Sequence, residues 1–296
     1  MDVAAMVARA CPDSRIAEVI QRTGGQLSTV FEVRRTDDDP VIVKVYAPEW
    51  AWKQAKEVHV YGLLASELGG SIPRVVHAEP AGELDAFTVL TKLDGVPLSE
   101  LKPPDWRATY EQLGQLVARV HRIPQPAYGY LTDQILDPLP DNDQYMRRQF
   151  AKKLGEFEQL GGDAALREKI RGYVEERSGL FAANQAATLC HNDFHEGNVL
   201  VDPVTWRVTG FIDVENAIAA DPLIDLAKTV SYSIHDNADK LAGLVDGYGP
   251  LPDDWQERVR LYRIYHSLEL WDWFASIGET THLNSIATDL AKLINN

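Results

Sequence analysis

The spacing of hydrophobic and polar positions changes along the chain from a two-residue alternation to a helical repeat. Residues 30–34 and 41–46 are rich in β-branched side chains, and a turn-forming Asp/Pro cluster at 36–40 separates them, which predicts a β-hairpin. Residues 52–68 then place Val58, Tyr61, Leu64 and Leu68 on one helical face. Residues 72–77 and 86–91 predict two further strands. The first third of the chain is therefore expected to be rich in strands.

The remainder of the chain is expected to be mainly helical. Apolar residues recur at helical spacing over 110–120, 166–181 and 255–294, whereas 199–201 and 208–212 read as short strands and 133–143 as a Pro- and Asp-rich loop. Asp94-Gly95 breaks the last strand of the first part. We expect an α+β fold with a β-rich N-lobe at residues 1–93 and a mainly helical C-lobe at residues 94–296.

Composition narrows the class of protein. The 296 residues carry a formal charge of −15, so neither nucleic acid nor an anionic membrane surface is an expected partner. The acidic residues either favour a cationic ligand or only keep the surface soluble. Two cysteines are too few for a disulfide framework, and no signal peptide or membrane-spanning apolar segment is evident. A cytoplasmic monomer or weak dimer is expected.

The densest cluster of candidate chemistry lies at residues 190–213. Asp193 follows His191 by two residues, Asn198 follows Asp193 by five, and Asp213 ends the second of two short apolar strands. Phosphoryl transfer needs an aligned hydroxyl and a bound Mg²⁺. Asp193 can accept or orient the hydroxyl proton, while Asn198 and Asp213 offer the oxygen ligands that Mg²⁺ prefers. Each residue alone is also typical of a turn or a strand end.

These motifs resemble the aminoglycoside phosphotransferase family, a small-molecule kinase branch of the protein-kinase-like fold. The resemblance rests on His-x-Asp-x-x-x-x-Asn at 191–198, Ile-Asp-x-Glu at 212–215 and Asp-Pro-x-x-Asp-Leu-Ala at 221–227. It implies a two-lobed protein-kinase-like fold, with ATP or GTP and Mg²⁺ as cofactors. It also implies that Asp225 holds the catalytic loop, although a helix N-cap is an alternative role.

The same resemblance assigns nucleotide-binding residues in the first lobe. Residues 24–31, with Ser28 and Thr29, look like the loop over the nucleotide phosphates. Lys44 resembles the lysine that contacts the α- and β-phosphates, and Glu57 the helix glutamate that pairs with it. Residues 89–95 resemble the hinge, where the backbones of Thr91 and Leu93 would hold the adenine.

The acceptor site is expected between the catalytic loop and the helical lobe. Glu269 shares a helical face with Tyr262, His266 and Trp273. Trp271 and Trp273 either stack on a sugar or belong to the core. His195 either contacts the substrate or only organises the loop. Acceptor-binding candidates are Glu269, Asp272, His195 and Glu196, and further carboxylates in the region are Asp137, Asp141, Asp143, Glu156 and Glu158.

The resulting hypothesis is a phosphotransferase with an alcohol group as acceptor. It would move the γ-phosphoryl of ATP or GTP to a hydroxyl of a small, cationic, polyhydroxylated compound such as an aminoglycoside or related antibiotic. The short segment 213–221 lacks room for the activation loop of a protein kinase. A choline, homoserine or amino-sugar kinase is the nearest alternative.

Two alternatives come from other classes of protein. In a metal-dependent hydrolase, His191, Asp193 and His195 would ligate Zn²⁺ together with Asp213. A catalytically silent module would only bind the nucleotide or a partner, although such modules usually lack the residues at the positions of Asp193 or Asp213.

Overall fold

The computed structural model describes residues 1–22 and 28–295, and within them the first lobe is built on a five-stranded antiparallel sheet. The strand order is β1-β2-β3-β5-β4, with the hairpin β2–β3 pairing Phe31 with Val43 as the alternation predicts. The strands are β1 Ile16–Arg22, β2 Ser28–Arg35, β3 Val41–Tyr46, β4 Val75–Glu79 and β5 Phe87–Thr91.

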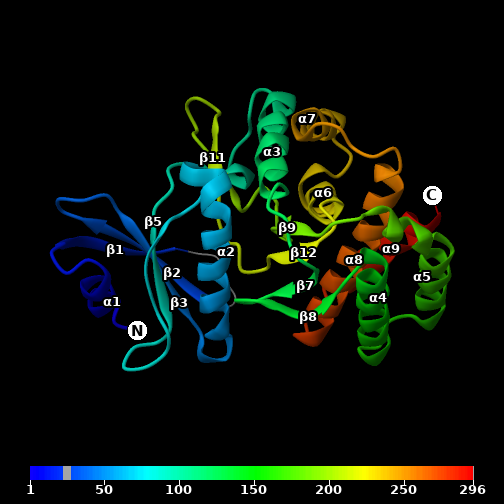
Figure 1. Ribbon diagram of the computed structural model, residues 1–296, viewed down its shortest axis with the longest axis horizontal. Coiled ribbons are helices and arrows are strands. Elements are labelled where there is room, and N and C mark those ends of the chain that lie inside the picture. Colours follow the sequence, from blue (N-terminus) through cyan, green and yellow to red (C-terminus); the bar gives the residue numbers. More distant parts are fainter. Residues whose placement is uncertain (23–27, 296) are drawn as a thin grey trace.

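Two helices flank this sheet. Helix α1 (Val3–Ala10) packs Met6 and Val7 into a small core with Val43 and Phe87 of the sheet. Helix α2 (Trp52–Leu68) lies between the sheet and the second lobe (Figure 1). Its residue Leu64 belongs to the large core that continues into the C-terminal half. The division into lobes at residue 93 therefore remains a proposal, because the apolar core crosses it.

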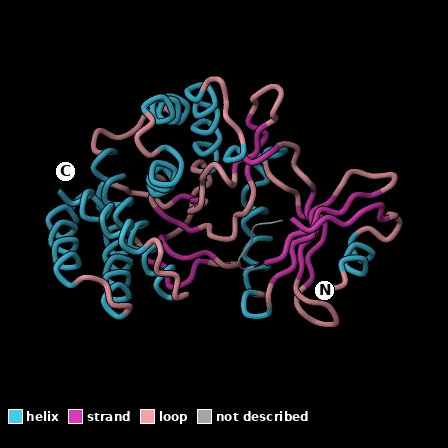
Figure 2. Tube along the Cα trace, turned by 180° about the vertical axis from the view of Figure 1, so that it is seen from behind, coloured by secondary structure: helices cyan, strands magenta, loops and turns pink. Residues whose placement is uncertain are grey.

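The second lobe is mainly helical and also contains two small sheets (Figures 1 and 2). Its helices are α3 Trp106–Val120, α4 Asn142–Gln159, α5 Ala164–Arg177, α6 Leu223–Thr229, α7 Ala238–Tyr248, α8 Trp255–Ser276 and α9 Leu283–Asn295. Its strands are β6 Val96–Pro97, β7 Tyr128–Leu131, β8 Ile135–Leu139, β9 Thr188–Cys190, β10 Val199–Val201, β11 Val208–Phe211 and β12 Ile218–Ala220. The sheet orders are β11-β10-β6 and β8-β7-β12-β9. The predicted α+β organisation is confirmed.

Short helical turns complete the chain. They are η1 Pro48–Trp50, η2 Gly69–Ser71, η3 Leu98–Glu100, η4 Ser178–Ala183 and the π-type turn η5 Val230–Ile234.

Several local expectations were wrong. Neither α1 nor β1 was expected from the sequence: α1 has only eight residues, and β1 shows no regular alternation of buried and exposed positions. The expected loop at 133–143 contains β8, which forms because it pairs with β7 through Tyr128 and Leu139, and α4 already begins at Asn142. The stretch expected to be helical at 255–294 forms two helices, α8 and α9, and the chain turns between them at Gly278, whose φ of 75° favours glycine.

Helices α3 and α7 pack unusually closely through glycines. A Cβ atom on Gly247 would overlap the carbonyl oxygen of Glu111, and one on Gly114 would overlap the carbonyl oxygen of Leu244. The backbones can approach this far only because both side chains are hydrogen atoms. This packing fixes α3, whose Tyr110 later contacts the catalytic loop.

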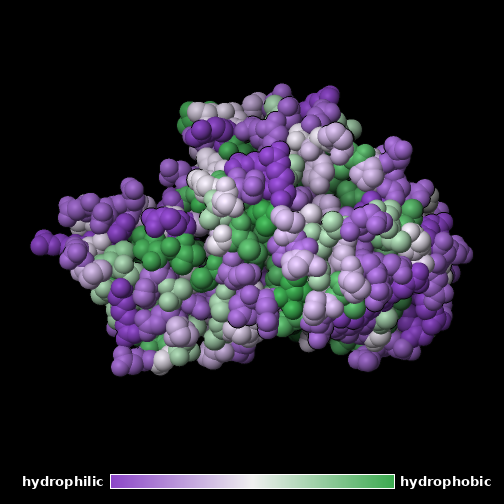
Figure 3. All heavy atoms as spheres, viewed as in Figure 1, coloured by the Kyte–Doolittle hydropathy of each residue, from purple (hydrophilic) through white to green (hydrophobic). Residues whose placement is uncertain are grey.

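Hydrophilic and apolar residues are distributed unevenly over the face of the molecule in view. Figure 3 shows hydrophilic residues over the outer ends of the molecule, with apolar residues gathered toward the middle of the view, where α2 lies beside the sheet. Among the described residues, no helix combines the length and the apolar character that crossing a membrane requires.

Candidate active site

The catalytic loop connects β9 to β10, and Asp225 of α6 holds its first residues in place. The Asp225 carboxylate is fully buried and accepts the backbone N–H groups of His191 at 2.7 Å and Asn192 at 2.6 Å. It also lies 3.0 Å from Nε2 of His121. Burial raises the pKa of Asp225, but the opposite effect of His121 and the loop amides is larger. The pKa of Asp225 is therefore lowered overall, and the carboxylate stays ionised. Asp225 therefore has the loop-holding role rather than that of an N-cap.

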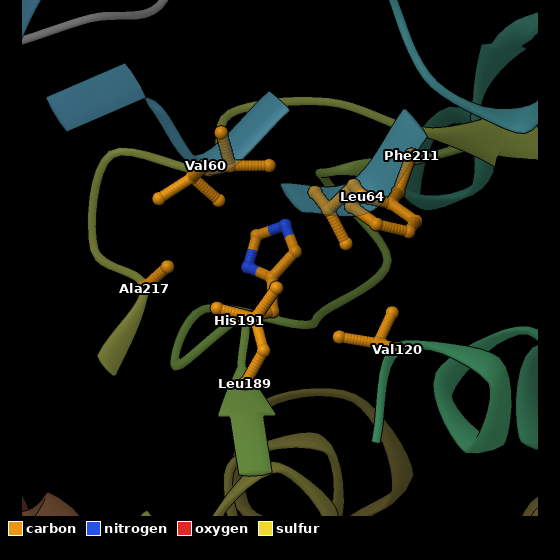
Figure 4. A pocket seen from close by; sticks show the side chains of 8 residues that line it. Val60, Leu64, Val120, Leu189, His191, Phe211 and Ala217 are labelled. Atoms are coloured by element: carbon orange, nitrogen blue, oxygen red, sulfur yellow. The ribbon is translucent and has the colours of Figure 1, made fainter. Parts of the chain in front are cut away.

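His191 connects the catalytic loop to a neighbouring segment of the chain. Its Nε2 lies 3.1 Å from the carbonyl oxygen of Ile212, which joins the catalytic loop to the segment that carries Asp213. Figure 4 shows the imidazole surrounded by apolar side chains, among them Val60, Leu64 and Phe211. Nδ1 has no hydrogen-bond partner among the described residues. The space around it has no room for a water molecule, so His191 has a structural position and cannot reach a ligand in the cleft.

Asp193 and Asn198 lie together at the far end of the loop. The Asn198 amide nitrogen donates to the Asp193 carbonyl at 2.9 Å and lies 3.3 Å from Oδ2 of its carboxylate. Burial raises the pKa of Asp193, but nearby His195 and Lys228 outweigh it and hold that pKa well below its usual range. Asp193 is thus an ionised carboxylate that can accept a hydrogen bond from a hydroxyl.

His195 contacts the loop itself. Its Nδ1 accepts the N–H of Gly197 at 3.0 Å, and its Nε2 lies 3.6 Å from Oδ1 of Asp193. A Cβ on Gly197 would lie 2.8 Å from the His195 ring, so a larger residue would displace the imidazole. This geometry favours the loop-organising role of His195.

Lys44 and Glu57 meet as the sequence predicts, and they do so within a larger charge cluster. The Lys44 ammonium lies 3.2 Å from Glu57, 2.9 Å from Asp213 and 2.7 Å from Glu215. Burial opposes its charge, but the three carboxylates raise the pKa of Lys44 well above its usual value. Burial raises the pKa of Asp213, but the effect of the Lys44 ammonium is larger, so the pKa of Asp213 is lowered overall. Tyr46 donates a hydrogen bond to Glu57 and fixes that carboxylate.

These groups line a cleft of about 1300 Å³ between the lobes. Ser28 lines it, whereas Thr29, on the opposite side of β2, does not. Residues 23–27 of the expected phosphate loop lie outside the described residues. At the hinge, the N–H of Thr91 already donates to the carbonyl of Arg74 at 2.9 Å. The backbone of Leu93 makes no hydrogen bond to any described residue and remains available.

Helices α4, α6 and α8 line the part of the cleft where the acceptor was expected from the sequence. Glu269 accepts from Tyr265 at 2.9 Å and lies 3.1 Å from His266. Burial raises its pKa, but His266 and Lys228 reduce the pKa of Glu269 to about 2. Asp272 is 3% exposed, and neither carboxylate oxygen has a hydrogen-bond partner among the described residues.

The nearest cation to Asp272 is Lys153, at 3.8 Å. Burial raises the pKa of Asp272 to about 7, although Lys153 opposes this shift. A buried carboxylate without a donor is costly unless a ligand supplies one. Trp273 lines the cleft and is 38% exposed, whereas Trp271 is buried in the core, 4.3 Å from the Phe157 ring.

Other sequence candidates lie elsewhere. Glu196 does not line the cleft; it accepts from Tyr110 at 2.6 Å and from Lys240 at 2.7 Å. Asp141 is the N-cap of α4. Asp143 pairs with Arg147, and Glu158 pairs with Arg167. Asp137 is exposed, with a φ of 44°. Glu156 does line the cleft.

Glu215, Lys53 and Lys228 are among the charged residues of the cleft that were not expected from the sequence. Glu215 bridges Lys44 and Lys53, and lies 3.2 Å from the latter. Its place in Ile-Asp-x-Glu was a usable signal, whereas Lys53 read as an ordinary exposed helix residue. The Lys228 ammonium lies 4.0 Å from the Asp193 carboxylate. Lys228 directly follows Ala227, the last residue of the Asp-Pro-x-x-Asp-Leu-Ala motif.

The residues present fit a hard divalent cation. Asp213 offers a carboxylate whose side chain is 39% exposed. The oxygen of Asn198 has no hydrogen bond to a described residue, because the amide nitrogen makes the contacts to Asp193. Two oxygen donors near a phosphate site suit Mg²⁺, which usually keeps several waters.

Comparison with known proteins agrees with this geometry. The sequence model of the phosphotransferase enzyme family (APH) matches residues 18–261. Streptomycin 3''-kinase of Streptomyces griseus is 28% identical over 62% of this chain and 68% of its own length. Aminoglycoside 3'-phosphotransferase of Streptomyces fradiae is 31% identical over 54% of this chain, and the match spans little more than half, 57%, of that relative.

Solved structures share the fold over the whole chain. The crystal structure of aminoglycoside phosphotransferase APH(4)-Ia superposes with a TM-score of 0.78 at 16% identity, covering 99% of this chain and 98% of that one. A complex of APH(2'')-IIIa with GDP and kanamycin has a TM-score of 0.73 at 15% identity, covering 98% and 97%. The protein-kinase-like fold expected from the motifs is confirmed, and the chain belongs to the phosphotransferase enzyme family.

Proposed function

We propose that this protein is a Mg²⁺-dependent kinase that transfers the γ-phosphoryl of ATP or GTP to a hydroxyl of a small cationic compound, such as an aminoglycoside. The observation that carries the proposal is the convergence of Lys44, Asp193, Asn198 and Asp213 on one cleft. These residues come from both lobes and are separated by up to 169 positions, as between Lys44 and Asp213.

The first lobe supplies the nucleotide site. The free backbone of Leu93 supports a role in holding the base, and Lys44 is placed to contact the phosphates. Glu57 and Tyr46 keep the Lys44 ammonium extended across the cleft. Asp213 and Asn198 would hold Mg²⁺, which supplies charge neutralisation for the phosphates. Lys44 then exchanges part of its contact with Asp213 for the nucleotide.

Asp193 acts on the acceptor hydroxyl. Its carboxylate is ionised, and the loop that carries it is fixed by Asp225, so the hydroxyl can be aligned before transfer. The hydroxyl proton passes to Asp193 as the new bond to phosphorus forms. His195 keeps the loop in this conformation.

The acceptor half supports a cationic substrate. Asp272 has two buried oxygens without a donor, which an ammonium group of the acceptor would satisfy. Glu269 and Glu156 add negative charge, while Trp273 offers an exposed ring on which a sugar can stack. Lys153 offsets part of that charge, so acceptors with a single cationic group, such as choline, homoserine and amino sugars, are kept as the second candidates.

The zinc hydrolase alternative lacks its ligand set. His191 donates toward Ile212 inside an apolar cage and cannot share an ion with Asp193. Among the described residues, the group of three side chains near enough to share an ion is His121, Cys190 and Asp225, which is buried behind the catalytic loop.

The experiment is a coupled assay of nucleotide consumption with ATP and GTP. The acceptor panel comprises aminoglycosides, cyclic-peptide antibiotics, macrolides, choline, homoserine and amino sugars, and NMR identifies the phosphorylated hydroxyl. We expect one acceptor class to stimulate consumption only when Mg²⁺ is present. Absence of transfer to every acceptor, with folded protein and saturating nucleotide, contradicts the proposal.

A further inference from the structure

Lys228 is a largely buried lysine at the reacting end of the acceptor pocket. It lies on α6, three residues after Asp225. Its side chain is 13% exposed and lines the cleft, and its ammonium lies 4.0 Å from Oδ1 of Asp193. Unlike Lys44, which has three carboxylate partners, Lys228 therefore sits beside the proposed catalytic carboxylate without a close ion pair.

Among the described residues, the contacts of the Lys228 ammonium are the Asp193 carboxylate at 4.0 Å, which is beyond hydrogen-bond distance, and one aromatic ring. The ammonium lies over the ring of Tyr232, 4.8 Å from the centroid. Burial opposes its charge, but Tyr232, Glu269 and Asp193 raise the pKa of Lys228 overall, so it is charged at neutral pH. Because Lys228 lines the cleft, the donors of its ammonium are available to a ligand with acceptor oxygens.

The two oxygens of Asp193 face different groups. Oδ2 lies 3.3 Å from the Asn198 amide nitrogen and 3.5 Å from that of Asn216. Oδ1 lies toward Lys228 and, at 3.6 Å, toward Nε2 of His195. The proposed metal ligand Asn198 and the cation Lys228 thus contact different oxygens of the same carboxylate.

We propose that Lys228 contacts the transferred phosphoryl group and stabilises the negative charge on its non-bridging oxygens. The inference rests on the proposed kinase function. A hydroxyl that bonds to Asp193 lies about 2.6–3.2 Å from it. The phosphorus it attacks lies about 3–3.5 Å further on. An ammonium 4.0 Å from the same carboxylate can reach the oxygens of that phosphoryl group.

The step balances without a further reactant. The acceptor oxygen forms its bond to the γ-phosphorus while the bond to the bridging oxygen breaks. The bond's electron pair leaves on the nucleoside diphosphate, and the hydroxyl proton passes to Asp193. Lys228 keeps its proton and meets the charge that spreads over the phosphoryl oxygens. Removing one such donor typically lowers kcat by about 10²–10³-fold.

The decisive variant is Lys228→Met, which removes the charge and retains most of the side-chain length. We expect kcat to fall about 100-fold while the KM values for nucleotide and acceptor change less than about threefold. Lys228→Arg, which keeps the charge, should recover at least a tenth of wild-type kcat. Lys292→Met is the matched control, because that lysine is 67% exposed on α9.

A binding measurement gives a second readout that does not depend on turnover. Calorimetry compares the nucleoside diphosphate with Mg²⁺ alone against the same mixture with aluminium fluoride, which mimics the phosphoryl group in transfer. Lys228→Met should bind the diphosphate normally and lose about 100-fold of the extra affinity that fluoride provides. Should the methionine variant fail to fold by circular dichroism, the same comparison is made with Lys228→Gln and Lys228→Arg.

The outcomes separate this inference from the proposed function. A folded wild-type protein that transfers no phosphoryl group to any acceptor or to water contradicts the kinase proposal itself. An active wild type with an equally active Lys228→Met variant overturns the role of Lys228. A rise in acceptor KM alone, with kcat and fluoride binding unchanged, also overturns it and assigns Lys228 to an anionic group of the acceptor.

Discussion

Asp225→Asn tests whether a single buried carboxylate fixes the catalytic loop. The carboxylate accepts two backbone N–H groups, one on each oxygen, and contacts His121 with the same oxygen that binds His191. Asparagine has one acceptor oxygen, so one loop N–H would face an amide NH₂ and lose its partner. The change is nearly isosteric, and any effect therefore reports on hydrogen bonding rather than packing.

The magnitude follows from those contacts. An unpaired buried N–H costs about 1–3 kcal/mol, and the remaining bond loses about 1 kcal/mol when the acceptor is no longer charged. The sum is about 3 kcal/mol of stability. At about 2.1 cal/mol/K of unfolding entropy per residue, this loss lowers the Tm of a 296-residue chain by about 5 °C. Because Asp193 follows two residues after His191, a displaced loop should also reduce kcat about 100-fold.

The assay pairs thermal unfolding by circular dichroism with phosphoryl-transfer kinetics. Asp253→Asn is the control, because Asp253 is exposed on the surface. We expect this substitution to change the free energy of unfolding by less than about 0.5 kcal/mol. If Asp225→Asn has a Tm within about 2 °C of wild type and kcat within about threefold, the loop-holding role is refuted.

Three further predictions address packing, the acceptor and the nucleotide. Gly247→Ala should lower the free energy of unfolding by about 1–3 kcal/mol, because the added Cβ would overlap the Glu111 carbonyl oxygen. The control Gly172→Ala in α5, where the added Cβ meets open space, should raise the free energy of unfolding by about 0.5–1 kcal/mol. Equal Tm values for the two variants would contradict the tight contact between α3 and α7. The KM of a cationic acceptor should fall as the pH rises through about 7, because Asp272 is neutral below that pH and ionised above it. Asp272→Asn should abolish this pH dependence of KM. An unchanged pH dependence in the variant would exclude Asp272 as its cause. Lys44→Met should weaken nucleotide binding, measured by calorimetry, at least about tenfold, and unaltered affinity would remove Lys44 from the phosphate site.

The sequence predicted the parts of the site that depend on local order. The β2–β3 hairpin follows from alternation, and Lys44 meets Glu57 because β3 and α2 are adjacent in the chain. Asp193 and Asn198 share one loop, so their spacing already brings them together. Asp225 was expected at the loop because its motif is recognisable, although its two bonds to the loop amides appear only in the folded structure.

Residues whose role depends on tertiary packing could not be predicted in the same way. Lys228 and Lys53 carry no local pattern, and each becomes a cleft residue only because α6 and α2 face the same space. Glu196 looked like part of the site from its neighbours in sequence. Its carboxylate points to Tyr110 and Lys240 because the loop turns between His195 and Gly197. The buried, donor-free state of Asp272 is likewise a property of α8 against α4.

The most direct test of the account is phosphoryl transfer by Asp193→Ala. The account predicts that nucleotide binds this variant with wild-type affinity, since Asp193 lies at the acceptor end of the cleft, while transfer to the acceptor falls at least about 10³-fold. Turnover near the wild-type rate in a folded Asp193→Ala variant would contradict the assignment of Asp193 and with it the proposed mechanism.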